Sequence, residues 1–167
     1  MVLYIVRHAE AEERCEAVAD EWRHLTEKGR RTAATMASEI ADLGPKPRQI
    51  ITSPLTRAVQ TAEIMAGFAC RKLSVEASTL LLPGGEVTAL IDYLSTCSSE
   101  RVMLVGHEPQ LGSLVATLLG RDLHVELKKG ACIALKLGNY LEQAEFLWYL
   151  APKSKPVTSF KKAFQTK

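Results

Sequence analysis

Residues 2–8 read Val-Leu-Tyr-Ile-Val-Arg-His, and this stretch decides the fold class expected for the chain. Its five apolar residues form a continuous run of the length of a buried β-strand. The run ends on Arg7 and His8, a permanent cation and a potential nucleophile. In an open α/β sheet, ligands bind beyond the carboxyl ends of the strands, so these two residues are expected to take part in chemistry.

The same arrangement occurs at two further places. Ile50-Ile51-Thr52 runs into Ser-Pro-Leu-Thr-Arg at 53–57, and apolar residues 102–105 run into Gly-His-Glu-Pro at 106–109. Two arginines and two histidines therefore follow three predicted strands, and they are Arg7, Arg57, His8 and His107.

These residue types suit the transfer of a phosphoryl group through a histidine. Arginine donates paired hydrogen bonds to phosphate oxygens and stays charged, so Arg7 and Arg57 are expected to hold a phosphate from two sides. A neutral imidazole is nucleophilic near pH 7, and His8 is the predicted attacker. A protonated His107 would share in stabilising the transferring group, and neither a metal nor another cofactor is then required.

Three blocks of the sequence resemble the signature blocks of the histidine phosphatase superfamily, which is phosphoglycerate mutase-like. They are Arg7-His8-Ala9, residues 53–62 and residues 105–109, and residues 25–29 resemble the segment leading into the family's first helix. The resemblance runs from residue 2 to about residue 150. The short insertion between the second and third blocks is most similar to the SixA-type phosphohistidine phosphatases, which remove phosphate from phosphohistidine on signalling proteins.

Two features of the chain, a short insertion and the residue at position 9, depart from the wider family pattern. Members that act on sugar phosphates usually carry a larger insertion, with a carboxylate that protonates the leaving oxygen. Here the candidate proton donor is Glu86, for which a charge at a helix start is the alternative. A modest acid would suit phosphohistidine, because a P–N bond breaks with less help once its imidazole is protonated. The second departure is Ala9, where some members have glycine.

Apolar residues recur at three- and four-residue spacing in four segments, which predicts four helices. The segments are 33–41, 55–65, 87–94 and 111–118. These helices alternate with the strands, and residues 131–137 and 145–150 are predicted as two more strands. The pattern indicates a single three-layer α/β domain, with helices on both faces of a central sheet that is mainly parallel but mixed.

Two helix starts are predicted beside the expected site. Ser53 is expected to cap a helix with Pro54 at its first position, and Pro109 marks a similar start. The Ser53 hydroxyl is also a candidate phosphate ligand. The partial positive charge of two helix N-termini should lower the pKa of His8 and keep it neutral, whereas a bound dianion should raise the pKa of His107.

Residues 1–151 are assigned to a catalytic domain, and residues 152–167 to a basic C-terminal tail. The tail holds five lysines and no acid, so a chain of net charge +2 leaves a body of net charge −3. The tail is expected to be a solvated terminus whose two phenylalanines pair with the core, with a contact for an anionic partner as the alternative. Nucleic-acid binding has little support, since the chain has no recognised module for it.

Four cysteines lie far apart in the sequence and follow neither a metal-binding nor a redox pattern: Cys15, Cys70, Cys97 and Cys132. The apolar run before Arg7 is too short for a secretory signal, and no run approaches the roughly 20 residues that cross a bilayer. The expected protein is therefore cytoplasmic, with free thiols and no membrane contact.

The leading hypothesis is a phosphatase that hydrolyses phosphohistidine on a signalling (phosphorelay) protein through a covalent intermediate on His8. The alternatives are a broad-specificity phosphatase of small phosphate esters and a non-catalytic module that binds phosphorylated proteins. The loops at 9–25 and 70–86 are expected to frame the pocket. Within the first loop, Arg14 and Arg23 are expected to face water rather than to steer the substrate.

Overall fold

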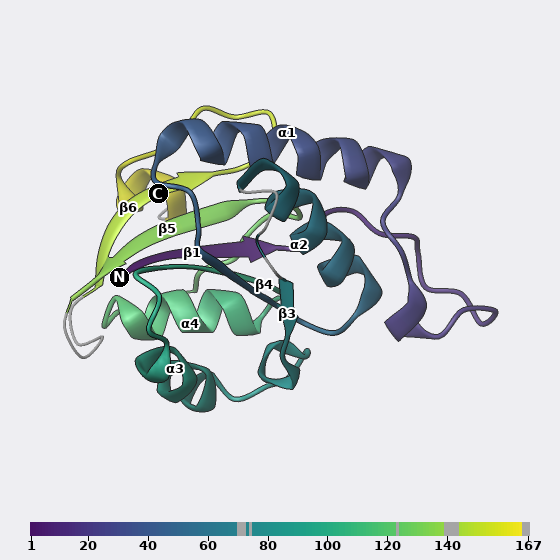
Figure 1. The fold of residues 1–167 in the computed structure, drawn as a ribbon, viewed down its shortest axis with the longest axis horizontal. Helices are drawn as coiled ribbons and strands as arrows, with labels where there is room; N and C mark the ends of the chain where they lie inside the picture. Colours follow the sequence, from purple (N-terminus) through teal and green to yellow (C-terminus); the bar gives the residue numbers. More distant parts are fainter. Residues whose placement is uncertain (70–72, 74, 123, 139–143, 165–167) are drawn as a thin grey trace.

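The fold is a six-stranded sheet between two layers of helices (Figure 1). The structure is a computed structural model, and it describes residues 1–69, 73, 75–122, 124–138 and 144–164. The strands are β1 (Val2–Arg7), β2 (Gln49–Thr52), β3 (Val75–Ala77), β4 (Arg101–Gly106), β5 (Cys132–Leu137) and β6 (Ala144–Leu150). Their order across the sheet is β3-β2-β4-β1-β5-β6.

The sheet is mixed in the way that the sequence predicts. Strands β1, β2, β3 and β4 are mutually parallel, whereas β5 runs antiparallel to both β1 and β6. Both predicted C-terminal strands are present. The short edge strand β3 was not expected, because only three residues of its segment are extended and two of them are exposed.

Helices cover both faces of the sheet. They are α1 (Glu27–Leu43), α2 (Thr56–Ala69), α3 (Val87–Thr96), α4 (Gln110–Leu118) and the short α5 (Phe160–Phe164), with 3-10 turns η1 (Asp20–Trp22) and η2 (Thr79–Leu81). On β1, Tyr4 and Val6 pack toward α1 and α2, while Leu3 and Ile5 pack toward α3 and α4. The alternation of side chains along a strand thus supplies two separate cores from one buried strand.

The predicted helices are all present, with one boundary displaced. The helix α2 begins at Thr56, two residues later than predicted, and the carbonyl of Leu55 accepts its first hydrogen bonds, from Ala58 and Val59. Ser53 is therefore not the N-cap. The helix α4 follows Pro109 as predicted and ends before Gly120, whose φ of 59° suits the left-handed position after a helix.

The parallel register brings the three motifs to one edge of the sheet. Arg7 of β1 lies opposite Gly106 of β4, and Thr52 of β2 lies opposite Val105 of β4. The next residue of each strand is therefore at the same carboxyl edge, and those residues are His8, His107 and Ser53. This edge is where an open α/β sheet binds its ligands.

The segment after residue 151 returns to the sheet. Phe160 is buried in the core shared with α3 and α4. Phe164 packs edge-to-face against Phe146 and at a tilt against Tyr149, with ring centroids 6.4 and 4.8 Å away. Lys167 lies outside the described residues. Among the helices that the structure describes, none is both long and apolar enough to span a membrane.

Candidate active site

A cavity of about 220 Å³ opens at the carboxyl edge of the sheet, where the three motifs meet. It is lined by Arg7, His8, Ala11, Arg14, Arg23, Arg57, Pro83, His107, Glu108 and Lys129. Four of these ten side chains are arginines and one is a lysine, whereas a single one is a carboxylate. The cavity therefore favours an anion.

His8 is buried and presents an unprotonated nitrogen. Its Nδ1 lies 2.7 Å from the carbonyl oxygen of Ala9, so Nδ1 carries the hydrogen and donates it, leaving the lone pair on Nε2. Burial, together with the charges of Arg57 and Arg7, lowers the pKa of His8 to about 4. The predicted neutral form is correct, but the main cause is burial rather than the helix field.

His107 lies beside His8 and contacts Ser53. The two imidazole rings have centroids 5.0 Å apart, and Nε2 of His107 lies 2.8 Å from the Ser53 hydroxyl. Burial lowers the pKa of His107 to about 3, helped by the charge of Arg57 and by the repulsion that two protonated imidazoles would have at this distance from His8. His107 is thus neutral in the protein alone, and only a bound anion would favour its charged form.

Arg7 is fixed by the segment that precedes β5. Its Nη1 donates to the carbonyl of Leu127 at 2.6 Å and lies 3.6 Å from the Glu126 carboxylate. Glu108 holds that segment in turn, because its two carboxylate oxygens accept the N–H groups of Leu127 and Gly112. A Cβ on Gly112 would lie 1.8 Å from the Val125 carbonyl, so the close approach of this segment to α4 requires glycine.

Arg57, the second residue of α2, is fixed by Asp20. Its Nη1 donates to the Asp20 carbonyl at 2.7 Å, and its Nη2 donates to the Asp20 carboxylate at 3.0 Å. Arg23 and Arg14 donate to the other carboxylate oxygen at 2.7 and 2.9 Å. Burial opposes ionisation of Asp20, but the hydrogen bond from Arg23 and the charge of Arg57 outweigh it and lower the pKa to about 2.

Both arginines keep one donor turned away from these contacts. The Nε groups of Arg7 and Arg57 are buried and have no hydrogen-bond acceptor among the residues that the structure describes. A buried N–H group without an acceptor is costly, so this pair of groups points to a ligand that accepts from both. An oxyanion between the two guanidinium groups would do so.

Three functional residues were missed by the sequence analysis. Asp20 fixes Arg57, and Arg23, expected to face water, has a side chain that is only 14% exposed and binds Asp20. Thr61 is fully buried; its hydroxyl donates to the Arg57 carbonyl at 2.7 Å and accepts from the Ala9 N–H at 3.1 Å. Its place four residues after Arg57 on a predicted helix was the available signal.

The remaining predicted residues lie as follows. Glu86 is the exposed N-cap residue of α3 and lies outside the set of ten residues that line the cavity. Ser53 is fully buried, accepts from the N–H of Leu55 at 3.3 Å, and contacts His107. The Arg14 side chain is 80% exposed, but it also lines the cavity and donates to Asp20, so both of its predicted roles stay open. Cys15, Cys97 and Cys132 are free thiols, and Cys70 lies outside the described residues.

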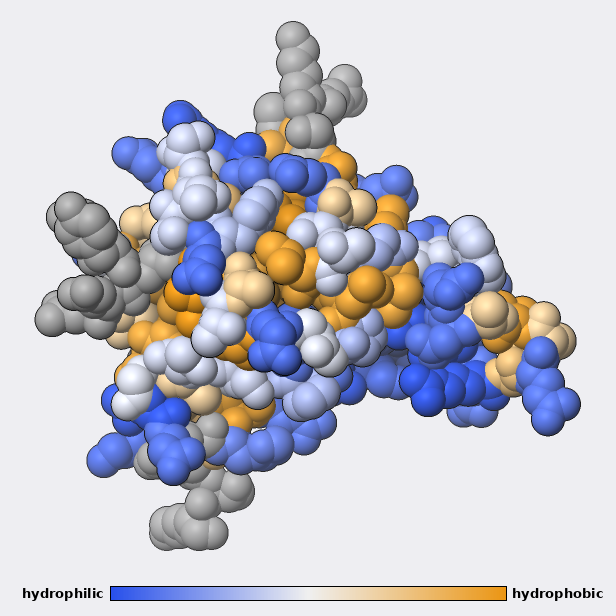
Figure 2. Space-filling model, turned by 90° about the horizontal axis from the view of Figure 1, so that it is seen from below, coloured by the Kyte–Doolittle hydropathy of each residue, from blue (hydrophilic) through white to orange (hydrophobic). Residues whose placement is uncertain are grey.

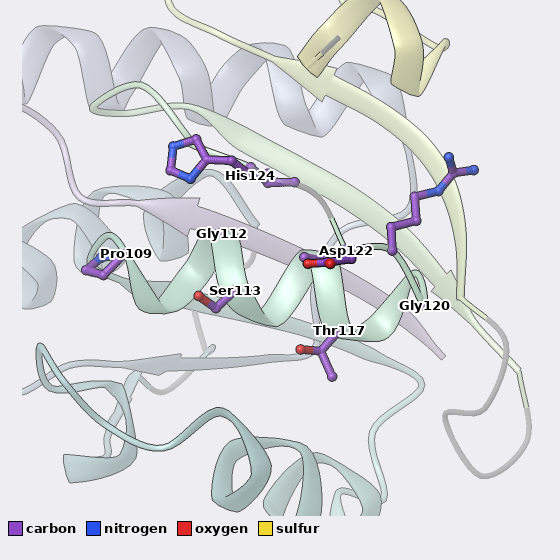
Figure 3. A pocket seen from close by; sticks show the side chains of 10 residues that line it. Pro109, Gly112, Ser113, Thr117, Gly120, Asp122 and His124 are labelled. Carbon is purple, nitrogen blue, oxygen red and sulfur yellow. The ribbon is translucent and has the colours of Figure 1, made fainter.

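A second, larger cavity of about 490 Å³ lies along α4 (Figure 3). Ser113 and Thr117 line it from the helix, and Asp122 and His124 from the segment that follows. Apart from Pro109, it contains no residue of the three motifs. Within the described ranges, no three His, Cys, Asp or Glu side chains are grouped so that they could hold a metal ion.

The two buried histidines predict how stability depends on pH. The folded chain keeps both neutral below their ordinary pKa of about 6.5, whereas the unfolded chain binds protons there, so stability falls as the pH falls. Each histidine contributes a slope of up to about 1.4 kcal/mol per pH unit between about pH 6.5 and its folded pKa. Urea unfolding between about pH 7 and about pH 5 measures this slope.

His8→Asn and His107→Asn should each make that slope shallower. The matched control is His124→Asn, because the His124 side chain is 84% exposed and should leave the slope of the wild type unchanged. Equal slopes in all four proteins would show that the two active-site histidines are not held neutral.

Comparisons with known proteins agree with this geometry. Residues 3–79 match the family model described as the histidine phosphatase superfamily (branch 1). The phosphohistidine phosphatase SixA of Escherichia coli is 31% identical over 158 residues, which cover 91% of this chain and 94% of SixA. An uncharacterized protein of Picosynechococcus is 34% identical over 145 residues, covering 83% of this chain and 86% of that protein.

The fold is also that of a solved relative. The structure of the protein histidine phosphatase SixA complexed with tungstate superposes with a TM-score of 0.83 and 26% identity. The match covers 91% of this chain and 97% of that protein. The likeness therefore extends over nearly the whole of both chains.

Proposed function

Because the chain belongs to the histidine phosphatase superfamily, we propose that it hydrolyses phosphohistidine on a signalling protein of the phosphorelay type, without a metal ion. The observation that carries the proposal is the state of His8. Its Nδ1 is committed to the Ala9 carbonyl, so the Nε2 lone pair is free for attack on phosphorus. Arg7, Arg57 and His107 surround the same cavity.

The reaction proceeds in two displacements. His8 Nε2 forms a bond to phosphorus while the P–N bond to the substrate imidazole breaks. That imidazole is protonated on its other ring nitrogen before the bond breaks, so it takes the electron pair and leaves as neutral imidazole. Water then attacks phospho-His8, which releases inorganic phosphate and restores the neutral imidazole. The guanidinium groups of Arg7 and Arg57 and a protonated His107 stabilise the charge on the transferring oxygens.

The acid chemistry of the site supports an imidazole leaving group. Glu108 is the carboxylate that lines the cavity, and burial raises its pKa although the N–H groups of Leu127 and Gly112 oppose that shift. Both its oxygens accept these backbone N–H groups, so its contacts serve to hold the segment at Leu127 rather than a leaving group. An alkoxide leaving group depends on a proton donor far more than a protonated imidazole does. Glu86 stays a proposal for that donor, placed at the exposed start of α3.

Other parts of the proposal rest on similarity and on the cysteines. The curated relative from Escherichia coli is named for phosphohistidine hydrolysis, and a SixA structure carries tungstate, a tetrahedral oxyanion like phosphate. We place the reaction in the cytoplasm, in keeping with the free thiols of Cys15, Cys97 and Cys132. The division into a catalytic domain of residues 1–151 and a basic tail of residues 152–167 is part of the same proposal.

The substrate class is tested by comparing rates on two kinds of phosphate compound. We expect kcat/KM on a histidine-phosphorylated protein to exceed that on sugar phosphates by at least about 100-fold, because the latter need a general acid worth ~10²–10⁴-fold. The measurement is release of inorganic phosphate by the same enzyme preparation. Equal or reversed rates would instead favour a broad-specificity phosphatase of small esters.

The same samples distinguish an enzyme from a binding module. After an acid-free quench, an enzyme that uses His8 retains phosphate that is labile to acid and stable to alkali. A module that only binds phosphorylated proteins would release no phosphate and carry no label. That outcome would contradict the proposed hydrolysis whatever the substrate.

A further inference from the structure

Residues 12–24 form a projection that we call the arm (Figure 1). The chain leaves and rejoins the fold at one point, where Ala11 bridges Leu25 and the N–H of Glu12 donates to the carbonyl of His24 at 3.0 Å. A second bridge between Cys15 and Val18 closes the turn at the tip. The arm therefore stands at the mouth of the cavity, beyond the carboxyl end of β1.

The arm is tied to the phosphate-binding side chains. Asp20 accepts from Arg57 with its backbone carbonyl and its carboxylate, and Arg23 donates to Asp20 and to the carbonyl of Glu12 at 2.7 Å. These contacts fix the base of the arm relative to the cavity. A feature on the arm is thus held in a defined position next to a bound phosphate.

The arm carries unusual apolar exposure. Trp22 is 67% exposed and Val18 is 40% exposed, and the third large apolar side chain found exposed in the described structure is Phe68 on α2. Figure 2 shows the arm as the protrusion at the right, with a hydrophobic end among hydrophilic residues. Tryptophan is strongly enriched among residues that dominate protein–protein binding energy, so its exposure here points to a protein partner.

The outer surface of the arm is acidic, in contrast to the cavity. Glu12, Glu13, Glu16 and Glu21 are exposed, whereas the two arginines of the arm both bind Asp20. These two arginines also line the cavity, together with Arg7, Arg57 and Lys129. A partner that fits both surfaces carries an anion for the cavity and basic side chains for the arm.

Chain distances place Trp22 within reach of a protein docked at the cavity. Trp22 follows Asp20 by two residues, which span at most about 7 Å of extended chain, and Asp20 touches Arg57. A protein surface around a phosphorylated histidine extends over this distance, since an ordinary interface buries roughly 800 Å² on each partner.

We infer that the arm is the docking element for the phosphorylated protein substrate. Trp22 and Val18 contact an apolar patch next to the phosphohistidine, and the arm's glutamates face lysines or arginines that border this patch. The inference rests on the proposed function, which supplies the class of partner. It adds a binding surface outside the cavity that a small phosphate compound does not use.

The test compares Trp22→Ala with wild type on two substrates. Among a panel of histidine-phosphorylated carrier and phosphotransfer domains, prepared with phosphoramidate, the one that wild type hydrolyses fastest is chosen. We expect Trp22→Ala to raise KM for this protein about tenfold or more, with kcat and the rate on free phosphohistidine within about twofold of wild type. Phe68→Ala is the matched control, another exposed aromatic side chain, on α2, that should change neither rate.

A second measurement follows binding directly. In His8→Ala, which should bind without turnover, the phosphorylated domain should shift Trp22 fluorescence to shorter wavelength, while Trp148, buried in the core, stays unchanged. Glu16→Lys with Glu21→Lys should weaken the same binding at low salt and lose its effect at high salt.

The outcomes separate the two levels of the hypothesis. If wild type hydrolyses no histidine-phosphorylated protein, the proposed function itself is wrong. If wild type hydrolyses the protein and Trp22→Ala does so with unchanged KM, or if the variant loses activity equally on free phosphohistidine, the docking role of the arm is wrong and the proposed function stands.

Discussion

Replacement of His8 by alanine should leave a folded protein whose turnover is lower by about 10⁴-fold or more, since removal of a nucleophile abolishes the covalent route as a whole. The Nε2 lone pair of His8 comes from a hydrogen bond between Nδ1 and the Ala9 carbonyl, so the attacking atom is defined by the backbone itself. Alanine retains the strand end, because the His8 N–H donates to the Gly106 carbonyl from the main chain. The measurement is phosphate release together with the circular dichroism spectrum.

His124→Ala is the matched control for this prediction. Its side chain is 84% exposed and lines the cavity along α4 rather than the one that holds His8. It should keep wild-type turnover. If His8→Ala retained more than about one hundredth of wild-type activity, attack by His8 would be excluded, since a nucleophile contributes far more than this factor.

Much of the fold and the four central side chains were predictable from the sequence. The apolar runs before Arg7 and His107 are buried central strands, and the residues after such strands meet at one edge when the strands are parallel. The helices of the two outer layers were also predictable, since apolar residues at three- and four-residue spacing match a helix with one buried face.

The contacts that orient those side chains were not predictable in the same way. Asp20 and Arg57 are 37 residues apart, and Glu108 reaches Arg7 only through the segment at Leu127. Pairing of this kind depends on where an irregular loop folds back, which has no periodic signal. The start of α2 was displaced because Ser53, a good capping residue, contacts His107 while Leu55 takes the capping position.

Asp20 adds to the site a carboxylate that orients Arg57, which the three strand-end motifs do not supply. Its backbone carbonyl and its carboxylate each accept from one outer nitrogen of Arg57, while the inner Nε stays without an acceptor in the described structure. The guanidinium of Arg57 therefore binds Asp20 through its two Nη groups and keeps its Nε–H for a ligand. The lysine ammonium lacks this planar fork, so it does not hold Asp20 on one side and a ligand on the other in a fixed geometry.

Arg57→Lys should therefore lower kcat/KM by about 10²–10³-fold, the usual effect of losing one preorganised donor to a transition-state anion. Asp20→Asn should cost less, about tenfold, because the backbone carbonyl of Asp20 still accepts from Arg57 at 2.7 Å. Both variants keep the size of the side chain they replace nearly unchanged. Steady-state kinetics on a histidine-phosphorylated protein measure both effects.

The double variant decides whether the two residues act as one unit. If Asp20 works by orienting Arg57, then Arg57→Lys with Asp20→Asn should be no slower than Arg57→Lys alone, because the group that Asp20 orients is already gone. Arg30→Lys is the control, since Arg30 is an exposed residue of α1 and should keep wild-type rates. Losses that multiply in the double variant would mean that Asp20 acts on the reaction independently of Arg57.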